Sequence, residues 1–352
     1  MTRGEHDPFV VAYLDSEGMK ASIERDVIEA AGGRLAVGNC TTDDEVMELA
    51  AEADAVLCRL YPLTGELLHR LPRLRCVSRS GVGYDNVDVE TATTLGIAVC
   101  NVVDYGYDEV ANHAFALLLA LNRKLFQLDS RLRRGERVRI PLEDPPAFML
   151  PTGRIAGQTL GLLAFGRIAQ EMARRAAGFR MRVIACDPFG DKAIADEMGV
   201  ELTTLDRLLT ESDYLSIHAP LTPATRGIIG VPELARMKSS AYLILTARGG
   251  IVDELALTDA LRNGIVAGAG IDTWATEPVR PDHELLGMDN VIATPHSAFF
   301  SEVSVETLRH RFADSAVDIC RGVTPRSLVN PEVAVRLGLS PRTVERVDGG
   351  PR

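Results

Sequence analysis

The sequence predicts an α/β fold of two domains, each built around a parallel sheet. Three observations lead to this class. Strand and helix signals alternate in two series along the chain, a nucleotide-binding pattern starts at Thr159, and three residues suited to acid, base or anion chemistry follow strands of the second series. A chain of 352 residues can hold two domains of ordinary size, each with a core of its own.

The first series of strands lies in the N-terminal third of the chain. Its apolar runs are separated by polar or helix-forming segments, and they are FVVAYLD from Phe9, RLAVG from Arg34, DAVLCRL from Asp54, LRCVSRS from Leu74 and IAVCNVV from Ile97. Alternation of this kind is typical of parallel strands joined by crossover helices. We therefore predict a small α/β domain in this part of the chain.

A long helix is predicted next, from about Asp108 to Arg134, with the wide apolar face of a helix packed between domains. We expect His113 on this helix to be a core or interface residue. The segment after it, RVRIPLEDPPAFMLPTGRIAG, carries four prolines and is predicted to be an irregular loop. A second helix, from about Ser301 to Arg321, could carry the chain back to the first domain.

The nucleotide-binding pattern combines several elements in order. A buried strand is predicted for Thr159–Leu163, a tight turn for residues 164–169, and a second strand for Met181–Cys186. Between the strands, a helix is indicated by a face of Ile168, Met172 and Ala176. Asp187 follows the second strand at about 20 residues from Gly166, the spacing at which an acidic side chain binds an adenosine ribose. The alternative for Asp187, which precedes Pro188, is a residue that opens a turn.

Three candidate catalytic residues follow strands of the second series. Arg248 comes after YLILTA, Glu277 after VAGAGIDTWAT and His296 after VIATP. Ligands of an open parallel sheet bind at the carboxyl ends of its strands, so these side chains can converge on one crevice. Each taken alone could be structural: a core histidine, a turn residue before Pro278, or a loop cation. Together, in this order and in a dinucleotide-binding fold, they favour an active site.

Composition excludes several classes of protein. The 49 acidic residues outnumber the 38 basic ones, and the net charge of −11 without a basic cluster argues against nucleic acid as a partner. The longest uncharged apolar stretch, Ala114 to Leu121, is far short of the roughly 20 residues that span a bilayer. The segment MTRGEHDPF shows no signal-peptide core. The six cysteines are widely spaced, so we expect reduced thiols in a cytoplasmic protein, with neither a metal site nor disulfides.

Five ordered motifs carry a resemblance to a known family. The runs SGVGYDNVD, GRIAQEMARRAAGFRMRVIACDP, TARGGIVDELAL, AGIDTWATEP and TPHSAF resemble the D-isomer-specific 2-hydroxyacid dehydrogenases. The segments NVVDYGYDEVANHA and HSAFFSEVSVETLRHRFADSAVDICRG are most similar to the C-terminal-binding-protein branch. The match extends over roughly residues 8–330.

The resemblance implies a particular architecture. We expect two Rossmann-like domains, with a dinucleotide-binding domain inserted into a discontinuous flavodoxin-like substrate domain. The substrate domain would comprise residues 1–107 and 300–330, the NAD-binding domain residues 108–299, and a C-terminal tail residues 331–352. The long helix and the loop after it would form the interface of a homodimer.

The resemblance also implies the site residues. Arg248, Glu277 and His296 would be catalytic, while backbone N–H groups of Val82 and Gly83, with Arg248 and Phe299, would contact the substrate. The residues expected to contact NAD are Val110, Phe165, Gly166, Arg167, Ile168, Asp187, Pro220, Leu221, Thr222, Thr225, Thr246, Ala247, Asp272, Ser297 and Ala298. Ala164 stands where the family has a glycine, and it would be strained if the turn needs an unusual backbone angle.

Two classes of function stay open. The first is an NAD-dependent dehydrogenase that interconverts a small 2-oxo acid and a 2-hydroxy acid. Hydride transfer to the C2 carbonyl leaves an alkoxide, to which a protonated His296 would donate while Glu277 fixes its tautomer and Arg248 clamps the carboxylate. The second is a dimeric, NAD-sensing interaction protein of the corepressor type. The complete catalytic set favours the enzyme.

Overall fold

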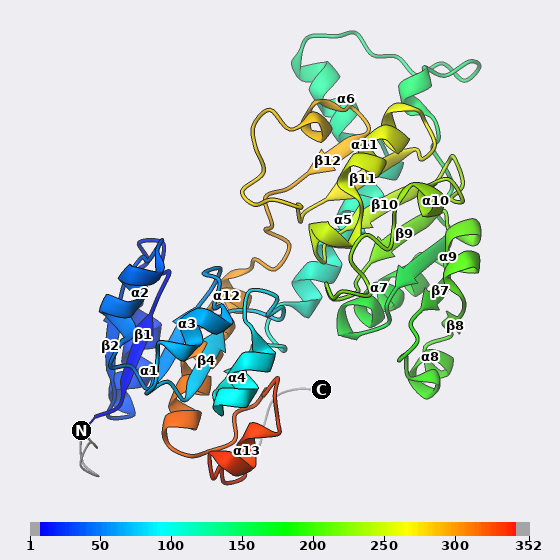
Figure 1. Ribbon diagram of the computed structural model, residues 1–352. Coiled ribbons are helices and arrows are strands. Elements are labelled where there is room, and N and C mark those ends of the chain that lie inside the picture. Colours follow the sequence, from blue (N-terminus) through cyan, green and yellow to red (C-terminus); the bar gives the residue numbers. More distant parts are fainter. Residues whose placement is uncertain (1–7, 343–352) are drawn as a thin grey trace. The chain divides into compact units, whose positions relative to one another are not determined.

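The structure is a computed structural model, and it describes residues 8–342 (Figure 1). The chain divides into two compact units. Unit 1 comprises the chain up to Tyr105 together with the chain from Glu302 onward, and unit 2 is the continuous segment Gly106–Ser301. Each unit contains one parallel sheet, which confirms the predicted α/β class. Across the described residues, no helix has the length and apolar character needed to cross a bilayer.

Unit 1 is built on a five-stranded parallel sheet with the order β2-β1-β3-β4-β5. All five strands of the first predicted series are confirmed, and their bounds are β1 Val10–Tyr13, β2 Arg34–Val37, β3 Ala55–Cys58, β4 Cys76–Arg79 and β5 Ala98–Cys100. Apart from β2, the strands are almost entirely buried, as expected for a parallel sheet covered on both faces.

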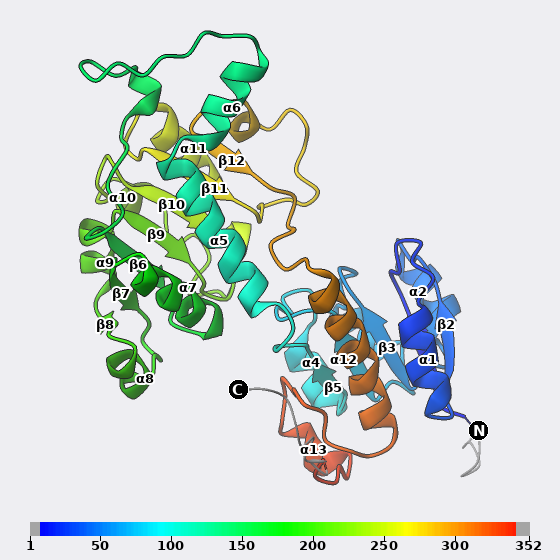
Figure 2. The same ribbon diagram turned by 180° about the vertical axis from the view of Figure 1, so that it is seen from behind.

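Helices cover both faces of this sheet. One face packs against α2 Asp43–Ala50, α3 Gly65–His69 and α4 Val89–Leu95. The other packs against α1 Ser22–Ala30 and α12 Glu302–Cys320, which lie side by side (Figure 2). Helix α12 lies close to the bounds predicted from the sequence. Its Phe312 is buried and meets Tyr13 of β1 edge-on, so the return of the chain completes the core of unit 1.

The segment after Asn330 differs from the predicted C-terminal tail. Its described part forms α13 Val333–Arg336 and packs on unit 1, with Val333 buried in the same core as Phe312. Asn330 is itself buried, and its side chain bonds the backbone of Val99 and Ile97. These contacts make the chain up to Arg342 part of the fold. The last segment, VDGGPR, lies outside the described residues.

Unit 2 is built on a seven-stranded parallel sheet with the order β12-β11-β10-β9-β6-β7-β8. Its strands are β6 Thr159–Leu163, β7 Arg182–Cys186, β8 Glu201–Leu202, β9 Tyr214–Ile217, β10 Tyr242–Leu245, β11 Gly268–Ile271 and β12 Val291–Ala293. The strand order reverses at β6, which lies between β7 and β9. In such sheets the reversal opens a crevice for ligand at the carboxyl ends of the strands.

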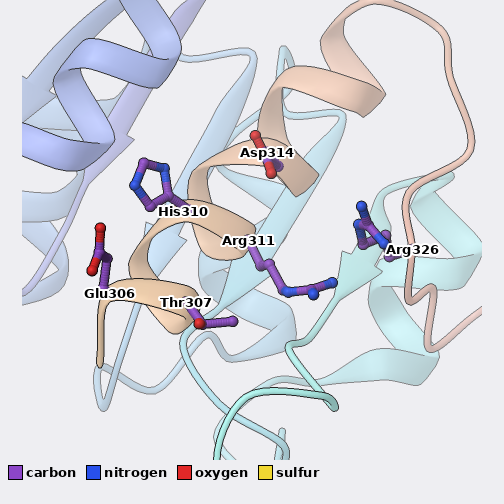
Figure 3. A pocket seen from close by; sticks show the side chains of 6 residues that line it. All are labelled: Glu306, Thr307, His310, Arg311, Asp314 and Arg326. Carbon is purple, nitrogen blue, oxygen red and sulfur yellow. The ribbon is translucent and has the colours of Figure 1, made fainter. Parts of the chain in front are cut away.

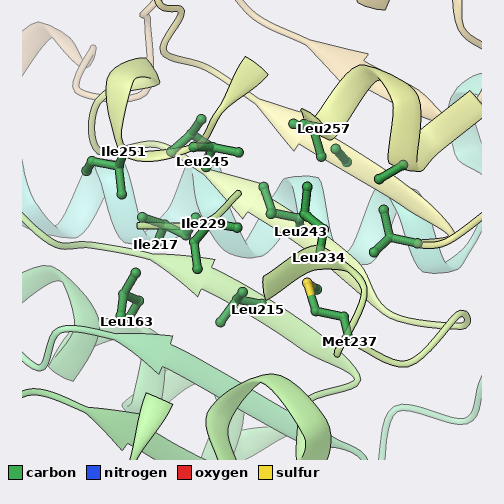
Figure 4. Close-up of a cluster of buried hydrophobic side chains, with 14 of the residues drawn as sticks. Leu163, Leu215, Ile217, Ile229, Leu234, Met237, Leu243, Leu245, Ile251 and Leu257 are labelled. Carbon is green, nitrogen blue, oxygen red and sulfur yellow. The ribbon is translucent and has the colours of Figure 1, made fainter. Parts of the chain in front are cut away.

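Two apolar cores hold the helices of unit 2 against its sheet. The first contains α9 Leu205–Glu211, α10 Val231–Leu234 and α11 Glu254–Arg262, whose leucines meet those of β9 and β10 (Figure 4). The second contains α5 Tyr107–Asn122, α7 Arg167–Gly178 and α8 Lys192–Glu197 on the opposite face. The remaining helical segments are α6 Leu125–Arg133, η1 Ala147–Met149, η2 Gly249–Ile251 and η3 Glu284–Gly287.

The long helix predicted from Asp108 to Arg134 is two helices, α5 and α6. The break lies at Lys124, whose backbone is left-handed with a φ of 56°. Its side chain is buried, and its Nζ donates to the hydroxyl of Tyr242 at 2.7 Å. A straight helix cannot continue through a left-handed residue, so the direction of the chain changes where this buried bond forms.

Candidate active site

The three candidate catalytic residues lie beyond adjacent strands of unit 2. Leu245 of β10 pairs with Ile271 of β11, and Ile271 pairs with Ala293 of β12. The segments that carry Arg248, Glu277 and His296 therefore leave the same edge of the sheet, as the sequence predicted.

His296 and Glu277 form the central pair of the site. His296 Nδ1 lies 2.7 Å from Glu277 Oε2, and each side chain is about one third exposed. The second carboxylate oxygen of Glu277 accepts the backbone N–H of Trp274 at 2.9 Å. Burial would raise the pKa of the Glu277 carboxyl, but the bonds from His296 and Trp274 outweigh burial and hold this pKa below its ordinary value. The positive charge of Arg248 lowers it further.

Asp272 fixes the loop that carries His296. Its carboxylate is fully buried and accepts three hydrogen bonds, from Thr294 Oγ1 at 2.6 Å, Ser297 N–H at 2.9 Å and Ala298 N–H at 3.0 Å. The carbonyl of Asp272 also accepts the N–H of His296 at 2.7 Å. The loop is therefore bonded to one aspartate before, at and after the histidine, whose φ of 51° is left-handed.

Arg248 is the last residue before the 3-10 turn η2, and the next residue must be glycine. A Cβ at Gly249 would overlap the Trp274 carbonyl carbon and the Ala275 nitrogen. The absence of a side chain lets the Arg248 turn lie directly on the segment between Asp272 and Glu277. This close approach links the placement of Arg248 to that of Glu277.

The turn between β6 and α7 has the geometry of a phosphate-binding turn. Gly166 is the N-cap of α7 and brings no side chain to its first turn, where the leading N–H groups of a helix lack intrahelical partners. A Cβ at Gly166 would meet nothing within 4 Å, so the backbone faces open space. Ala164 has a φ of 72°, the left-handed angle that makes glycine favourable at this position.

Asp187 lies at the end of β7 beside this turn. Its Oδ2 accepts the N–H of Phe165 and its Oδ1 accepts the N–H of Phe189, both at 2.8 Å. The second bond is the local turn bond of the alternative raised from the sequence. The first bond joins the two strand ends, and each carboxylate oxygen retains capacity for another donor.

The described residues fit a dinucleotide in a further respect. The hydroxyl of Thr246, at the carboxyl end of β10, is buried and has no hydrogen-bond partner within residues 8–342. A buried hydroxyl without a partner costs free energy, which a ligand at this edge of the sheet would recover. Thr246, Gly166 and Asp187 together present a donor, an open backbone and an acceptor, the groups that NAD requires.

The segment from His218 to Thr225 is folded on itself. Thr225 Oγ1 donates to the carbonyl of Pro220 at 2.6 Å and accepts the N–H of Thr222 at 2.8 Å. Leu221 packs against the first core of unit 2. Desolvation lowers the pKa of His218 to about 3, so its ring is neutral and bonds Ser216 at 2.8 Å. This histidine orders its loop and carries no charge near neutral pH.

The predicted substrate contacts Val82 and Gly83 lie in unit 1, in the loop after β4. A side chain fixes this loop, because Asn101 Nδ2 donates to the carbonyl of Val82 at 2.6 Å.

A separate surface pocket of about 320 Å³ lies along α12, lined by Glu306, Thr307, His310, Arg311, Asp314 and Arg326 (Figure 3). The site residues predicted from the sequence do not line this pocket.

Sequence reasoning did not assign a function to three features of the site. The first is the set of hydrogen bonds by which Asp272 holds the His296 loop, and the second is the close approach of Gly249 to the backbone of Trp274. The third is the 3.0 Å bond between His113 Nε2 and Thr294 Oγ1. The glycine pair after Arg248 was a signal for a close approach. The bond of His113 has no local signal, because its partner is 181 positions away along the chain.

Comparison with known proteins agrees with this geometry. Residues 115–298 match the model of the D-isomer-specific 2-hydroxyacid dehydrogenase NAD-binding domain. A glyoxylate reductase of Korarchaeum cryptofilum is 39% identical over 82% of this chain and 86% of its own length. A D-3-phosphoglycerate dehydrogenase of Methanocaldococcus jannaschii is 36% identical over 85% of this chain, which spans 56% of that relative.

The fold is also found among solved structures. The crystal structure of D-lactate dehydrogenase from Aquifex aeolicus, complexed with NAD and lactic acid, has a TM-score of 0.78 and is 27% identical. It covers 92% of this chain, which covers 97% of it in return. The match of the NAD-binding domain and the identity to full-length relatives identify the chain as an NAD-dependent member of the D-isomer-specific 2-hydroxyacid dehydrogenase family.

Proposed function

We propose that this enzyme interconverts a small 2-oxo acid and the corresponding D-2-hydroxy acid, with His296 as the proton donor. The observation that carries the proposal is the 2.7 Å contact between His296 Nδ1 and Glu277 Oε2 beyond adjacent strand ends. With Nδ1 held by a carboxylate, Nε2 is the ring atom that meets the substrate oxygen. When bound, NADH would supply a hydride for C2, and the Nε2 proton of His296 would pass to the carbonyl oxygen.

Other residues hold the reactants. The guanidinium of Arg248 binds the substrate carboxylate and polarises the carbonyl, and the N–H groups of Val82 and Gly83 bind the same carboxylate. Phe299, whose ring lies edge-on to that of His296 with centroids 6.5 Å apart, forms a wall of the substrate site. In this assignment unit 1 is the substrate domain.

The contacts to NAD follow from the turn after β6. The N–H groups of Gly166, Arg167 and Ile168 at the start of α7 bind the pyrophosphate, and Asp187 binds the adenosine ribose. The other contacts that we assign to NAD come from loops and strand ends of unit 2, namely Val110, Phe165, Pro220, Leu221, Thr222, Thr225, Thr246, Ala247, Asp272, Ser297 and Ala298.

Glyoxylate is the first substrate to test, because three relatives that match over more than four fifths of both chains are named for its reduction. A panel of glyoxylate, hydroxypyruvate, pyruvate and branched 2-oxo acids, with NADH consumption as the readout, identifies the substrate class. We expect His296→Ala to lower the rate on the best substrate by roughly 100-fold while NADH still binds, because general acid catalysis contributes about that much.

The matched control is His69→Ala, an exposed histidine in the last turn of α3. Wild-type turnover by His296→Ala would remove the assigned role. A wild-type chain that binds NADH but reduces none of these acids would instead support the alternative of an NAD-sensing interaction protein.

We also infer a homodimer, formed through α6 and the loop after it. Large apolar side chains in this part of unit 2 are more than half exposed, namely Leu125, Phe126, Leu132, Leu142 and Leu150. A patch of this kind on a folded enzyme marks an interaction surface. Sedimentation should give a dimer for the wild type and a monomer for Phe126→Glu with Leu132→Glu, whereas a monomeric wild type would contradict the inference.

The free thiols of all six cysteines support a cytoplasmic location.

A further inference from the structure

The hydrogen bonds behind the His296 loop continue to a histidine on α5. His113 Nε2 lies 3.0 Å from Thr294 Oγ1 and 3.7 Å from Asp272 Oδ1. Thr294 is two residues before His296 in the chain. A side chain on a helix therefore reaches, through one hydroxyl, the loop that presents the proton donor.

In the series of hydrogen bonds from His113 through Thr294 to Asp272, the donor of each bond can be assigned. The hydroxyl of Thr294 has one proton, and it is donated to the carboxylate of Asp272 at 2.6 Å. The Thr294 oxygen can then only accept from His113, so Nε2 of His113 carries a proton. Asp272 accepts two further bonds from backbone N–H groups of the loop and is fully buried. A buried acceptor with three donors fixes the positions of all three.

The bond from His113 is one of a series along the first half of α5. In the first turn, Glu109 Oε1 accepts the hydroxyl of Ser301 at 2.7 Å. Just before the helix, a Cβ on Gly106 would lie 3.4 Å from the carbonyl oxygen of Phe299, an ordinary contact distance. The segment from Thr294 to Ser301 thus lies along α5, and His113 is at the end of the series nearest the catalytic histidine.

We propose that His113 is a positioning residue for the reaction, and that it acts through Thr294 and Asp272 on the placement of His296. The inference rests on the proposed role of His296 as the proton donor. His113 does not need to touch the substrate. Its N–H orients the Thr294 hydroxyl toward Asp272, and the orientation of that hydroxyl holds the loop at the residue where it turns into Pro295 and His296.

The effect of His113 on the loop comes from its N–H donor and not from the bulk of its ring. His113→Leu keeps most of the side-chain volume but removes the N–H. The oxygen of Thr294 then loses the hydrogen bond that helps to orient its hydroxyl toward Asp272. His113→Gln places an amide N–H at a similar distance along the side chain and should restore the bond. Thr294→Val removes the hydroxyl itself. The matched control is Asn112→Ala, the preceding residue on α5, which bonds Asp108 and Arg175 on another side of the helix.

Two readouts test the proposal. In His113→Leu we expect kcat on the best 2-oxo acid to fall about tenfold, the effect of one neutral hydrogen bond. The backbone amides of Ser297 and Ala298, which bond Asp272, should exchange with deuterium about tenfold faster. His113→Gln should match the wild type in both readouts, and His113→Leu combined with Thr294→Val should be no worse than either change alone.

The proposal is overturned if His113→Leu keeps wild-type kcat or if the amides of Ser297 and Ala298 in this variant exchange at the wild-type rate. It is also overturned if His113→Gln is as impaired as His113→Leu. The exchange experiment needs no substrate. A wild-type chain without activity would therefore remove the proposed function, while the amides would still decide whether His113 holds the loop.

Discussion

Ala164 offers the sharpest test of how the phosphate-binding turn is built. Its φ of 72° is left-handed, which costs a residue with a Cβ about 1–2 kcal/mol. Ala164→Gly removes this cost. Against it stand the backbone entropy of glycine, about 0.5–1 kcal/mol, and the loss of a half-buried methyl, worth less than about 0.8 kcal/mol. The central values leave a net change close to zero, with a small gain of about 0.3 kcal/mol.

The same substitution elsewhere gives the control. Ala173 lies inside α7 and is 3% exposed, so Ala173→Gly loses about 1 kcal/mol of helix propensity and about 0.8 kcal/mol for the buried methyl. The two variants should therefore differ by about 2 kcal/mol in the free energy of unfolding. Urea denaturation of both proteins beside the wild type measures this difference directly.

Cofactor binding gives a second readout for Ala164→Gly. A glycine keeps the turn in the left-handed conformation without strain, so calorimetry should show tighter binding of NADH. The strain argument is refuted if Ala164→Gly loses as much stability as Ala173→Gly, or if NADH binds more weakly than to the wild type. Either result would mean that the local backbone has adapted to alanine.

Three further predictions concern the site. The pKa of Glu277 lies below its ordinary value of 4.5, so its contribution to stability is complete above that pH and is lost as the pH falls through the lower folded value. As the pH is lowered through this range, the urea midpoint should fall less steeply for Glu277→Gln than for the wild type. Parallel curves of midpoint against pH would contradict the lowered pKa of Glu277. Gly249→Ala should lower both kcat and the thermal midpoint, because its methyl displaces the Trp274 backbone; Gly287→Ala, where a Cβ has open space, is the control, and a fully active Gly249→Ala would contradict the overlap. Asp187 should repel a 2′-phosphate, so kcat/KM should be higher with NADH than with NADPH, and equal values would remove its ribose role.

The accuracy of sequence reasoning followed the range of the interactions that determine each feature. The strand Thr159–Leu163 was predicted with the bounds that it has, because a run of apolar residues bounded by a turn is a local signal. The placement of Arg248, Glu277 and His296 beyond neighbouring strands also followed from local signals, combined with the rule for parallel sheets.

Features that depend on distant partners were not predictable in this way. The break at Lys124 depends on a bond to Tyr242, 118 positions away in the chain. The packing of Val333 depends on a core shared with β1 and α12. No glycine or proline marks the end of α5 at Lys124, so the helical pattern that continues to Arg134 was misleading. Around Val333 the segment is apolar and follows Pro331, but these local signals do not show which core it joins.

The insertion of unit 2 into unit 1 has a consequence for the order in which the chain folds during synthesis. The strands of unit 1 leave the ribosome first, but one face of their sheet is covered only in part, by α1, until α12 with Phe312 and Ala316 has been made. Unit 2 is continuous, and its first and last turns are joined by the bond between Glu109 and Ser301. The domain begun second can therefore be completed first, while the N-terminal sheet waits with exposed apolar surface for its last helix.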